Sequence, residues 1–497
     1  MVDSPGSVTG TAVARGRIVA AAITGTTIGW YDFFLFLGAI PLVFFPRPAP
    51  ADEVPTLVLL GAGFVGRLAG GALFGHFGDR LGRRSTLIAT LVTLGLPTAA
   101  IGLLPGRAPL GFATLALLTL LRLVQGAGLG GEWAGAVLMA MEWEPDRLKR
   151  GFAASLPQVG VPLGLLLAMA TLSAARLLPP DAFAAWGWRA PFLFSLALVG
   201  VCWRLRRGLP ETPEFLRWRP RARTPDRPAL EVLRHHWHQV AASARARLSA
   251  DLLFYGCVVT VLRIGFGGGL SSDAGLALAA TLLACATAAV AIPMAGHLSD
   301  RHGRGPVYGL GIAVLAVVAT PLFTMLGSGV PILVLAAMLA AAAVHAIQYG
   351  PQAALIAEGF TPRLRYSGAA LSYQLGSIPA GILVPAVSVL FPDRALFWIA
   401  LGVVACCLVS ASALLPPRRF LVTVALLSVL GAAFLVVAAL SGRSGLAALV
   451  VQTVDGRSLL WQWVNNLGNV IALVSVAVWL TTWIAGRAAR RRRDRVL

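Results

Sequence analysis

Charged residues are scarce in this sequence, and lysine is nearly absent. Only 12% of the 497 residues are charged, whereas 57% are hydrophobic, and Lys149 is the single lysine. A soluble globular domain carries about a quarter charged residues, so a soluble protein of this length would lack the polar side chains that cover its surface. The composition argues against a soluble enzyme, a disordered scaffold and a secreted disulfide framework, and it predicts a polytopic membrane protein.

Cysteine is also rare, and no catalytic or nucleotide-binding motif is present. The five cysteines all fall within apolar runs and have no metal-ligand spacing, which predicts neither a disulfide nor a zinc site. A phosphate-binding G-x-x-x-x-G-K-S/T loop is missing too, so the sequence contains no ATP-driven engine. We therefore expect no enzyme activity, no metal and no cofactor.

Acidic residues are outnumbered about two to one by basic residues, 21 against 41, which gives a formal net charge of +20. Nucleic-acid binding would need the basic residues on one polar face. Here they form short clusters between apolar runs, as in the cytoplasmic loops of membrane proteins, so no nucleic-acid partner is expected.

Long apolar runs are abundant, and about 20 apolar residues suffice to span a bilayer as a helix. We count 14 such runs, with the N-terminus placed inside. The inside segments then hold 31 of the 41 basic residues, the outside segments hold seven, and three fall within spans. This bias predicts cytoplasmic N- and C-termini.

The chain repeats itself. GHFGDRLGRR at 75–84 returns as GHLSDRHGRG at 296–305, and Glu142 returns as Glu358. Duplicated halves are typical of alternating-access transporters, whose substrate site lies between the halves. We expect an all-α fold with these parts: a cytoplasmic tail (1–17), a six-helix bundle (18–207), a cytoplasmic linker (208–247), a second six-helix bundle (248–415), and two additional transmembrane helices with a basic cytoplasmic tail (416–497).

The repeated loop resembles the G-x-x-x-D-R-x-G-R-R signature of the major facilitator superfamily. The surrounding sequence resembles the metabolite:proton symporters of that superfamily, which include shikimate, α-ketoglutarate and proline/betaine permeases. The similar segments include GTTIGWYDFFLF (25–36), RLVQGAGLGGEWAGAVLMAMEWEP (122–145) and LPETPEF (209–215). The chain departs from the pattern at Gly29, where glutamate is usual, and at Leu68.

This resemblance implies a proton-coupled symporter of the bacterial inner membrane that imports an organic acid or a betaine-like zwitterion. The energy would come from the proton gradient. The alternatives are a proton-driven exporter and a transporter-like receptor that no longer transports. We expect a monomer in the lipid bilayer, with the C-terminal helix pair as a candidate for contact with a partner.

Ionisable residues at membrane depth are costly and are functional candidates. Asp32, Arg122 and Glu132 are assigned to proton coupling, against the alternative of structural ion pairs. The residues assigned to substrate binding are polar or charged and fall within predicted spans: Arg67, Gln125, Tyr255, Arg263, His345, Gln348, Tyr349, Gln352, Tyr373 and Gln374.

The interior charges are expected to balance, with Asp32, Glu132 and Asp251 against Arg67, Arg122 and Arg263. Protonating one acid would leave an excess positive charge, so the substrate should carry a carboxylate, held by Arg67 and Arg122.

A gating latch is expected at the inner face, because charged residues recur there at matching positions of the two halves. Its expected members are Asp79, Arg83, Arg84 and Glu142 in the first half, and Asp300, Arg301, Arg304 and Glu358 in the second.

Overall fold

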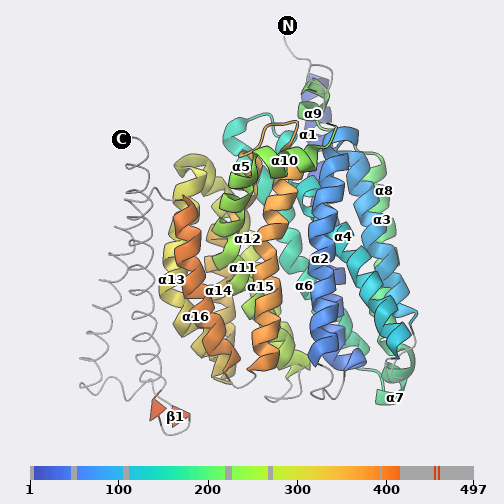
Figure 1. Cartoon of the computed structure of the whole chain (residues 1–497), viewed down its shortest axis with the longest axis vertical. Helices are drawn as coiled ribbons and strands as arrows, with labels where there is room; N and C mark the ends of the chain where they lie inside the picture. Colours follow the sequence, from blue (N-terminus) through green and yellow to red (C-terminus); the bar gives the residue numbers. More distant parts are fainter. Residues whose placement is uncertain are drawn as a thin grey trace, which may run out of the picture.

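The chain forms a bundle of long, nearly parallel helices (Figure 1). The computed structural model describes residues 5–45, 53–104, 111–218, 226–266, 273–391 and 394–414, and the strands β1 (Thr453–Val454) and β2 (Arg457–Ser458), which pair antiparallel. Within these residues, 11 helices are long and apolar enough to cross a membrane. A twelfth span results if the bent pair Pro180–Gly187 and Arg189–Arg207 is counted as one.

The first half begins with a helix that extends into the predicted N-terminal tail, since α1 starts at Pro5. A π-helical turn continues α1 over Ile40–Phe44. The fifth span is assembled from short pieces, because Pro157 and Pro162 interrupt regular backbone hydrogen bonding. The α-helices of this half are α1 (Pro5–Ala39), α2 (Glu53–Leu81), α3 (Arg83–Gly102), α4 (Phe112–Glu142), α5 (Arg150–Ser155), α6 (Gly160–Ala175), α7 (Pro180–Ala182) and α8 (Arg189–Arg207).

The second half follows two short helices at the inside end, α9 (Pro213–Trp218) and α10 (Pro228–His235). The seventh spanning helix begins at Trp237, so its first residues fall within the predicted linker 208–247. The α-helices of this half are α11 (Trp237–Phe266), α12 (Ala274–His302), α13 (Arg304–Gly327), α14 (Pro331–Ala357), α15 (Arg365–Leu390) and α16 (Ala395–Leu414). The predicted spans near 420–441 and 459–485 lie outside the described residues.

The packing repeats between the halves, as the sequence repeat predicts. α2 packs on α4 in the first half, and α12 packs on α14 in the second. The halves meet through α2 against α15 and through α5 against α12. The halves also contact each other through α1 against α11 and through α6 against α12.

Glycines set the distance between α2 and α4. A Cβ on Gly66 would collide with the carbonyl oxygen of Leu123, and one on Gly130 would collide with that of Arg67. Small residues let membrane helices approach backbone to backbone. Two further glycines, Gly82 and Gly303, sit at matching loop positions with φ of +106° and +89°, a conformation that side chains disfavour.

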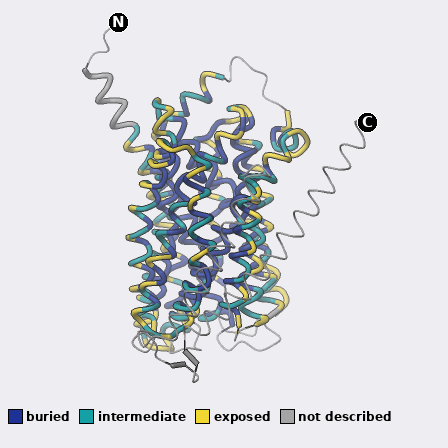
Figure 2. Tube along the Cα trace, turned by 90° about the vertical axis from the view of Figure 1, so that its left-hand side faces the viewer, coloured by how far each residue is buried: buried dark blue, intermediate teal, exposed yellow. Residues whose placement is uncertain are grey.

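Burial follows the pattern of a membrane bundle (Figure 2). Tyr31, Phe34 and Tyr366 are fully buried between the helices, whereas Leu96 and Val290 on the perimeter are about 60% exposed. An apolar perimeter is what a lipid environment requires, since lipid is as apolar as the core.

Candidate functional site

A buried carboxyl without an ion-pair partner lies in the first half. Asp32 of α1 is fully buried, and neither carboxylate oxygen has a hydrogen-bond partner among the described residues. The nearest polar groups are the hydroxyls of Thr98 and Ser195. The alternative was a structural ion pair between Asp32 and an arginine. No such pair is present in the described part of the chain. A buried carboxyl without a counter-ion is far easier to keep neutral than charged.

Arg122 of α4 lies close by and is only partly hydrogen-bonded. Its Nη1 donates to Gln125 Oε1, while Nε and Nη2 find no partner in the described residues. Gln125 in turn donates from Nε2 to Thr98 Oγ1 at 2.7 Å and to the carbonyl oxygen of Asp32 at 3.4 Å. The guanidinium carbon lies 4.0 Å from the ring centroid of Phe36. Gln125 thus ties Arg122 to the backbone beside Asp32.

Glu132, by contrast, is an ion-pair member. Arg206 Nη2 of α8 donates to Glu132 Oε1 at 2.8 Å, and both side chains are 2% exposed. The hydroxyl of Thr26 lies 3.4 Å from Glu132 Oε2. Breaking such a buried pair costs about 3–5 kcal/mol, so Glu132 is a poorer site for a mobile proton than Asp32.

Arg67 of α2 reaches into the second half with three of its nitrogens. Nε donates to Gln374 Oε1 at 3.0 Å, Nη1 to the Tyr255 hydroxyl at 2.8 Å, and Nη2 to Ser377 Oγ at 3.3 Å. Gln374 also donates to the carbonyl oxygen of Gly130 at 2.9 Å. These bonds join α2 to α11 and α15 in the middle of the bundle.

A small central cavity lies between the halves. It measures about 10 Å³, which is room for about one water molecule. The first half contributes Trp30 and Val161. The second half contributes Arg247, Asp251, Phe254, Tyr255, His345, Tyr349 and Tyr373. Four of the predicted substrate residues therefore meet here, and the helices are closed around them.

Aromatic side chains shape this cavity. His345 stacks on Phe254 and on Tyr349, with centroids 5.4 Å and 4.8 Å apart. The hydroxyls of Tyr349 and Tyr373 are 3.1 Å apart.

Six predicted substrate residues do not line the cavity: Arg67, Gln125, Arg263, Gln348, Gln352 and Gln374. Gln348 accepts from Ser249 Oγ at 2.9 Å and donates to the carbonyl oxygen of Gly311 at 3.2 Å, so both ends of its amide are used within the second bundle. Gln352 donates to the Tyr308 hydroxyl at 3.1 Å. Arg263 was expected to face the interior, and this expectation is wrong. It lies near the end of α11 and is exposed, because the helix turns it away from the core there.

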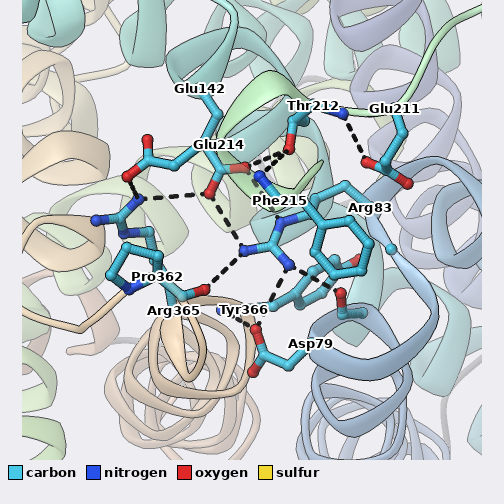
Figure 3. A network of polar contacts seen from close by, with 12 residues as sticks. Asp79, Arg83, Glu142, Glu211, Thr212, Glu214, Phe215, Pro362, Arg365 and Tyr366 are labelled. Carbon is cyan, nitrogen blue, oxygen red and sulfur yellow. Dashed lines mark hydrogen bonds and ion pairs between the residues drawn. The ribbon is translucent and has the colours of Figure 1, made fainter. Parts of the chain in front are cut away.

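The inner face carries a buried network built on the first repeated loop (Figure 3). Asp79 accepts from the backbone N–H groups of Tyr366 at 3.0 Å and Ser367 at 2.9 Å, at the N-terminus of α15 in the other half. Arg83 donates from Nε and Nη2 to Glu142, both at 3.2 Å, and from Nη2 to the carbonyl oxygen of Pro362 at 3.0 Å. A carboxylate at a helix N-terminus is stabilised by the free N–H groups and by the helix dipole.

The second half repeats this arrangement. Asp300 accepts from the N–H groups of Gly151 at 2.8 Å and Phe152 at 2.9 Å, at the start of α5 in the first half. Arg304 contacts Asp300 at 2.6 Å and Glu358 at 3.0 Å. Each half thus caps a helix of the other with an aspartate.

Two expected latch members are not ion-paired. Arg84 donates from Nη2 to the carbonyl oxygen of Arg207 rather than to a carboxylate. Arg301 is exposed, and no ion pair of it is found within the described residues. Of the other latch arginines, Arg83 reaches the opposite half at the carbonyl oxygen of Pro362, whereas the carboxylates bound by Arg304 belong to its own half.

Known proteins resemble this chain in sequence and in fold. Residues 18–246 and 264–416 match the family described as sugar (and other) transporter. The chain belongs to this family of the major facilitator superfamily. The inner membrane metabolite transport protein YhjE of Escherichia coli is 36% identical over 76% of this chain and 87% of its own length. The shikimate transporter of E. coli is 35% identical over 80% and 92%.

The solved structures agree on the fold. The proton:xylose symporter XylE of E. coli, bound to 6-bromo-6-deoxy-D-glucose, matches with a TM-score of 0.63. It is 18% identical, and the match covers 81% of this chain and 95% of that protein. This major facilitator protein is thus a multi-pass transporter, and its relatives place it in the bacterial inner membrane.

Three buried arginines and one acid are hard to recognise in the sequence because they lie among loop charges. Arg206, Arg247 and Arg365 were counted as cytoplasmic basic residues, yet all three are buried. Glu214 of α9 went unnoticed in the linker. A signal existed for Arg247, because Asp251 follows it by four residues and would face it on a helix.

Helix α9 ties the inner network together. Glu214 accepts from Arg150 at 3.0 Å and from Arg365 at 2.9 Å, and Thr212 donates to Glu142 at 2.6 Å. Burial alone would raise the pKa of Glu214, but the guanidinium groups of Arg365 and Arg150 hold that pKa below its ordinary value. The linker thereby bridges the two halves of this transporter.

Replacing Glu214 by glutamine should open the inner face more readily. Charged hydrogen bonds of this kind stabilise the closed inner face by about 1.5 kcal/mol. Without them, the accessibility of the interior from the inside should rise roughly tenfold. Because the pKa of Glu214 is lowered, its contribution is present above the ordinary carboxyl pKa and is lost as the pH falls through the lowered value. Labelling of an engineered inner cysteine at neutral and acidic pH measures both effects.

Glu231→Gln is the matched control, since its pair with Arg363 spans 3.8 Å and both side chains are substantially exposed. Equal labelling rates in Glu214→Gln and Glu231→Gln would show that α9 does not hold the inner face.

Proposed function

We propose that this chain is a proton-coupled symporter that imports a small carboxylate-bearing metabolite, an organic acid or a betaine-like zwitterion, by alternating access. The observation that carries the proposal is the fully buried Asp32, which has no counter-ion among the described residues and is linked through Gln125 to the partly free guanidinium of Arg122. Such a carboxyl can take a proton from one side of the membrane and release it to the other. Its relatives are transporters, so we propose no enzymatic reaction and no cofactor beyond the proton gradient.

The interior charges support an anionic substrate. The expected balance of three acids and three arginines changes, because Arg263 is exposed and Arg206 and Arg247 are buried. Asp32, Glu132 and Asp251 now stand against Arg67, Arg122, Arg206 and Arg247. Glu132 and Asp251 are paired with Arg206 and Arg247, so two positive charges, those of Arg67 and Arg122, remain in excess when Asp32 is protonated. A carboxylate compensates one of these charges, whereas a cation would add to the excess.

The inner network supports alternating access. Asp79 and Asp300 each bind the backbone of the opposite half, so the halves can separate at the inside only when both contacts break. The central cavity is too small for a metabolite, so substrate entry also requires the helices to part. We propose that Arg83, Glu142, Arg304 and Glu358 hold the closed inner face.

We further propose that the transporter acts as a monomer in the lipid bilayer, with protons and the metabolite as its small partners. The C-terminal segment remains the proposed place of contact for any protein partner.

The test is uptake into sealed vesicles. With an imposed gradient, inside alkaline, radiolabelled shikimate or proline should accumulate several-fold, and a protonophore should abolish the accumulation. Accumulation that survives the protonophore but fails without ATP would overturn the proposal. Gradient-driven efflux instead of uptake would identify the protein as an exporter.

A further inference from the structure

A second buried ion pair lies in the seventh spanning helix and has no part in the mechanism so far. Arg247 and Asp251 are four residues apart on α11, and their side chains are 1% and 6% exposed. Arg247 donates from Nε at 3.1 Å and from Nη2 at 2.7 Å and 2.8 Å to the two oxygens of Asp251. Its guanidinium carbon lies 3.4 Å from the ring centroid of Tyr373.

One end of this guanidinium is unused. The Nη1 nitrogen is buried and has no hydrogen-bond partner among the described residues, whereas Nε and Nη2 face Asp251. A buried donor without an acceptor costs roughly 1–3 kcal/mol elsewhere in proteins, and such groups call for an explanation. Because Arg247 lines the central cavity, a ligand in that cavity can supply the acceptor.

Arg247 lines the cavity, whereas the two arginines expected to bind the substrate do not. Each of three nitrogens of Arg67 already donates to a side chain of the second half, and neither Arg67 nor Arg122 is among the residues that line the cavity. Tyr255, which accepts from Arg67, does line it. Arg67 therefore acts on a cavity ligand through Tyr255, and Arg247 acts directly.

An apolar cavity of about 60 Å³ adjoins this polar one. The two share Val161, Phe254, His345 and Tyr349, so they adjoin along these side chains. The remaining lining consists of aliphatic side chains and thiols, such as Leu165, Val258, Cys285 and Met338. Among the described lining residues, the only charged groups therefore lie at the Arg247 end.

We propose that the substrate is a monocarboxylate with a branched or cyclic apolar body, whose carboxylate accepts hydrogen bonds from the free end of Arg247 while its body enters the adjoining apolar cavity. This inference rests on the proposed transport of a carboxylate and narrows its class. Asp251 keeps the other edge of the guanidinium and holds it in place. The excess positive charge of Arg67 and Arg122 balances the added anion.

Calorimetric titration of the purified protein tests this with acetate, isobutyrate and isovalerate, and with isovaleramide as the uncharged control. Each added methylene or methyl group that enters an apolar cavity should strengthen binding roughly fourfold, so isovalerate should bind at least about tenfold more tightly than acetate. Isovaleramide should bind at least tenfold more weakly than isovalerate. Equal affinities across the acids, or tighter binding of the amide, would overturn the proposal.

Two variants locate the site. The double variant Arg247→Gln/Asp251→Asn removes both charges without leaving either unpaired, so it should fold and yet lose isovalerate binding by about 100-fold. Ala288→Phe should fill the apolar cavity and weaken isovalerate binding while sparing acetate. Arg263→Gln, on the exposed face of the same helix, is the control and should bind as the wild type does.

These outcomes separate the inference from the proposed function. Wild-type affinity in a well-folded double variant would refute the role of Arg247, even if gradient-driven uptake of a carboxylate is found. Conversely, isovalerate binding that depends on Arg247 but is never accompanied by gradient-driven uptake would support the site and refute the symporter.

Discussion

Replacing Asp32 by asparagine should abolish gradient-driven accumulation, so that the substrate reaches only equal concentrations on the two sides of a vesicle. The asparagine side chain has nearly the same shape but carries no exchangeable carboxyl proton. Because Asp32 has no ion-pair partner among the described residues, the change breaks no salt bridge, and the protein should fold normally. Accumulation and counterflow exchange in proteoliposomes measure the effect, and exchange should persist.

Asp146→Asn is the matched control, because Asp146 lies at the surface and pairs with Lys149 at 3.4 Å. This variant should accumulate substrate like the wild type. Normal accumulation in Asp32→Asn would remove Asp32 from the coupling path.

Neutralising Asp79 should shift the transporter toward inward-open states far more than neutralising Asp300. Asp79 and Arg83 are both fully buried, and Glu142 beside them is buried as well. In the second half, Arg304 is 14% exposed and Glu358 is 38% exposed, so water can replace part of what is lost there. Asp79 binds two backbone N–H groups and neighbours a guanidinium. Compared with a neutral amide, such a buried carboxylate stabilises the closed inner face by about 1–3 kcal/mol, which corresponds to about 5–150-fold in the equilibrium between closed and open inner face.

Labelling of a single inner cysteine in Asp79→Asn and Asp300→Asn measures this shift. We expect a large increase in labelling rate in the first variant and an increase of at most a few-fold in the second. Equal rates in the two variants would mean that the halves contribute equally, and unchanged rates would contradict a latch role for the network.

Much of the inner network was predictable because its residues occur twice. The pairing of Arg83 with Glu142 and of Arg304 with Glu358 follows from loop charges that recur at matching spacing. The repeat says nothing about which backbone atoms Asp79 reaches, since these belong to α15, almost 290 residues away. Glu214 was missed for the same reason, because its partners Arg150 and Arg365 come from both halves.

The central site was predictable only in part. Tyr255, His345, Tyr349 and Tyr373 line the cavity as expected, since polar aromatic residues in apolar helices have few other places to lie. Arg206 and Arg247 were assigned to loops because charge counting treats every arginine near a span end as solvated. A shift of one or two residues along the helix, which turns a side chain by about 100° per residue, decides whether it meets water or a buried acid.

Hydrophobic length and charge bias are local properties, so they already identify a duplicated bundle of membrane helices with basic segments inside. The pairing of the buried charges becomes visible only in the packed helices. Among the described residues Asp32 has no ion-pair partner, Glu132 is bound to Arg206, and Asp251 to Arg247, while Arg263 lies exposed. The physical reason is that pairing depends on how separate helices face one another, and the strength of an electrostatic contact depends on the burial that this packing creates.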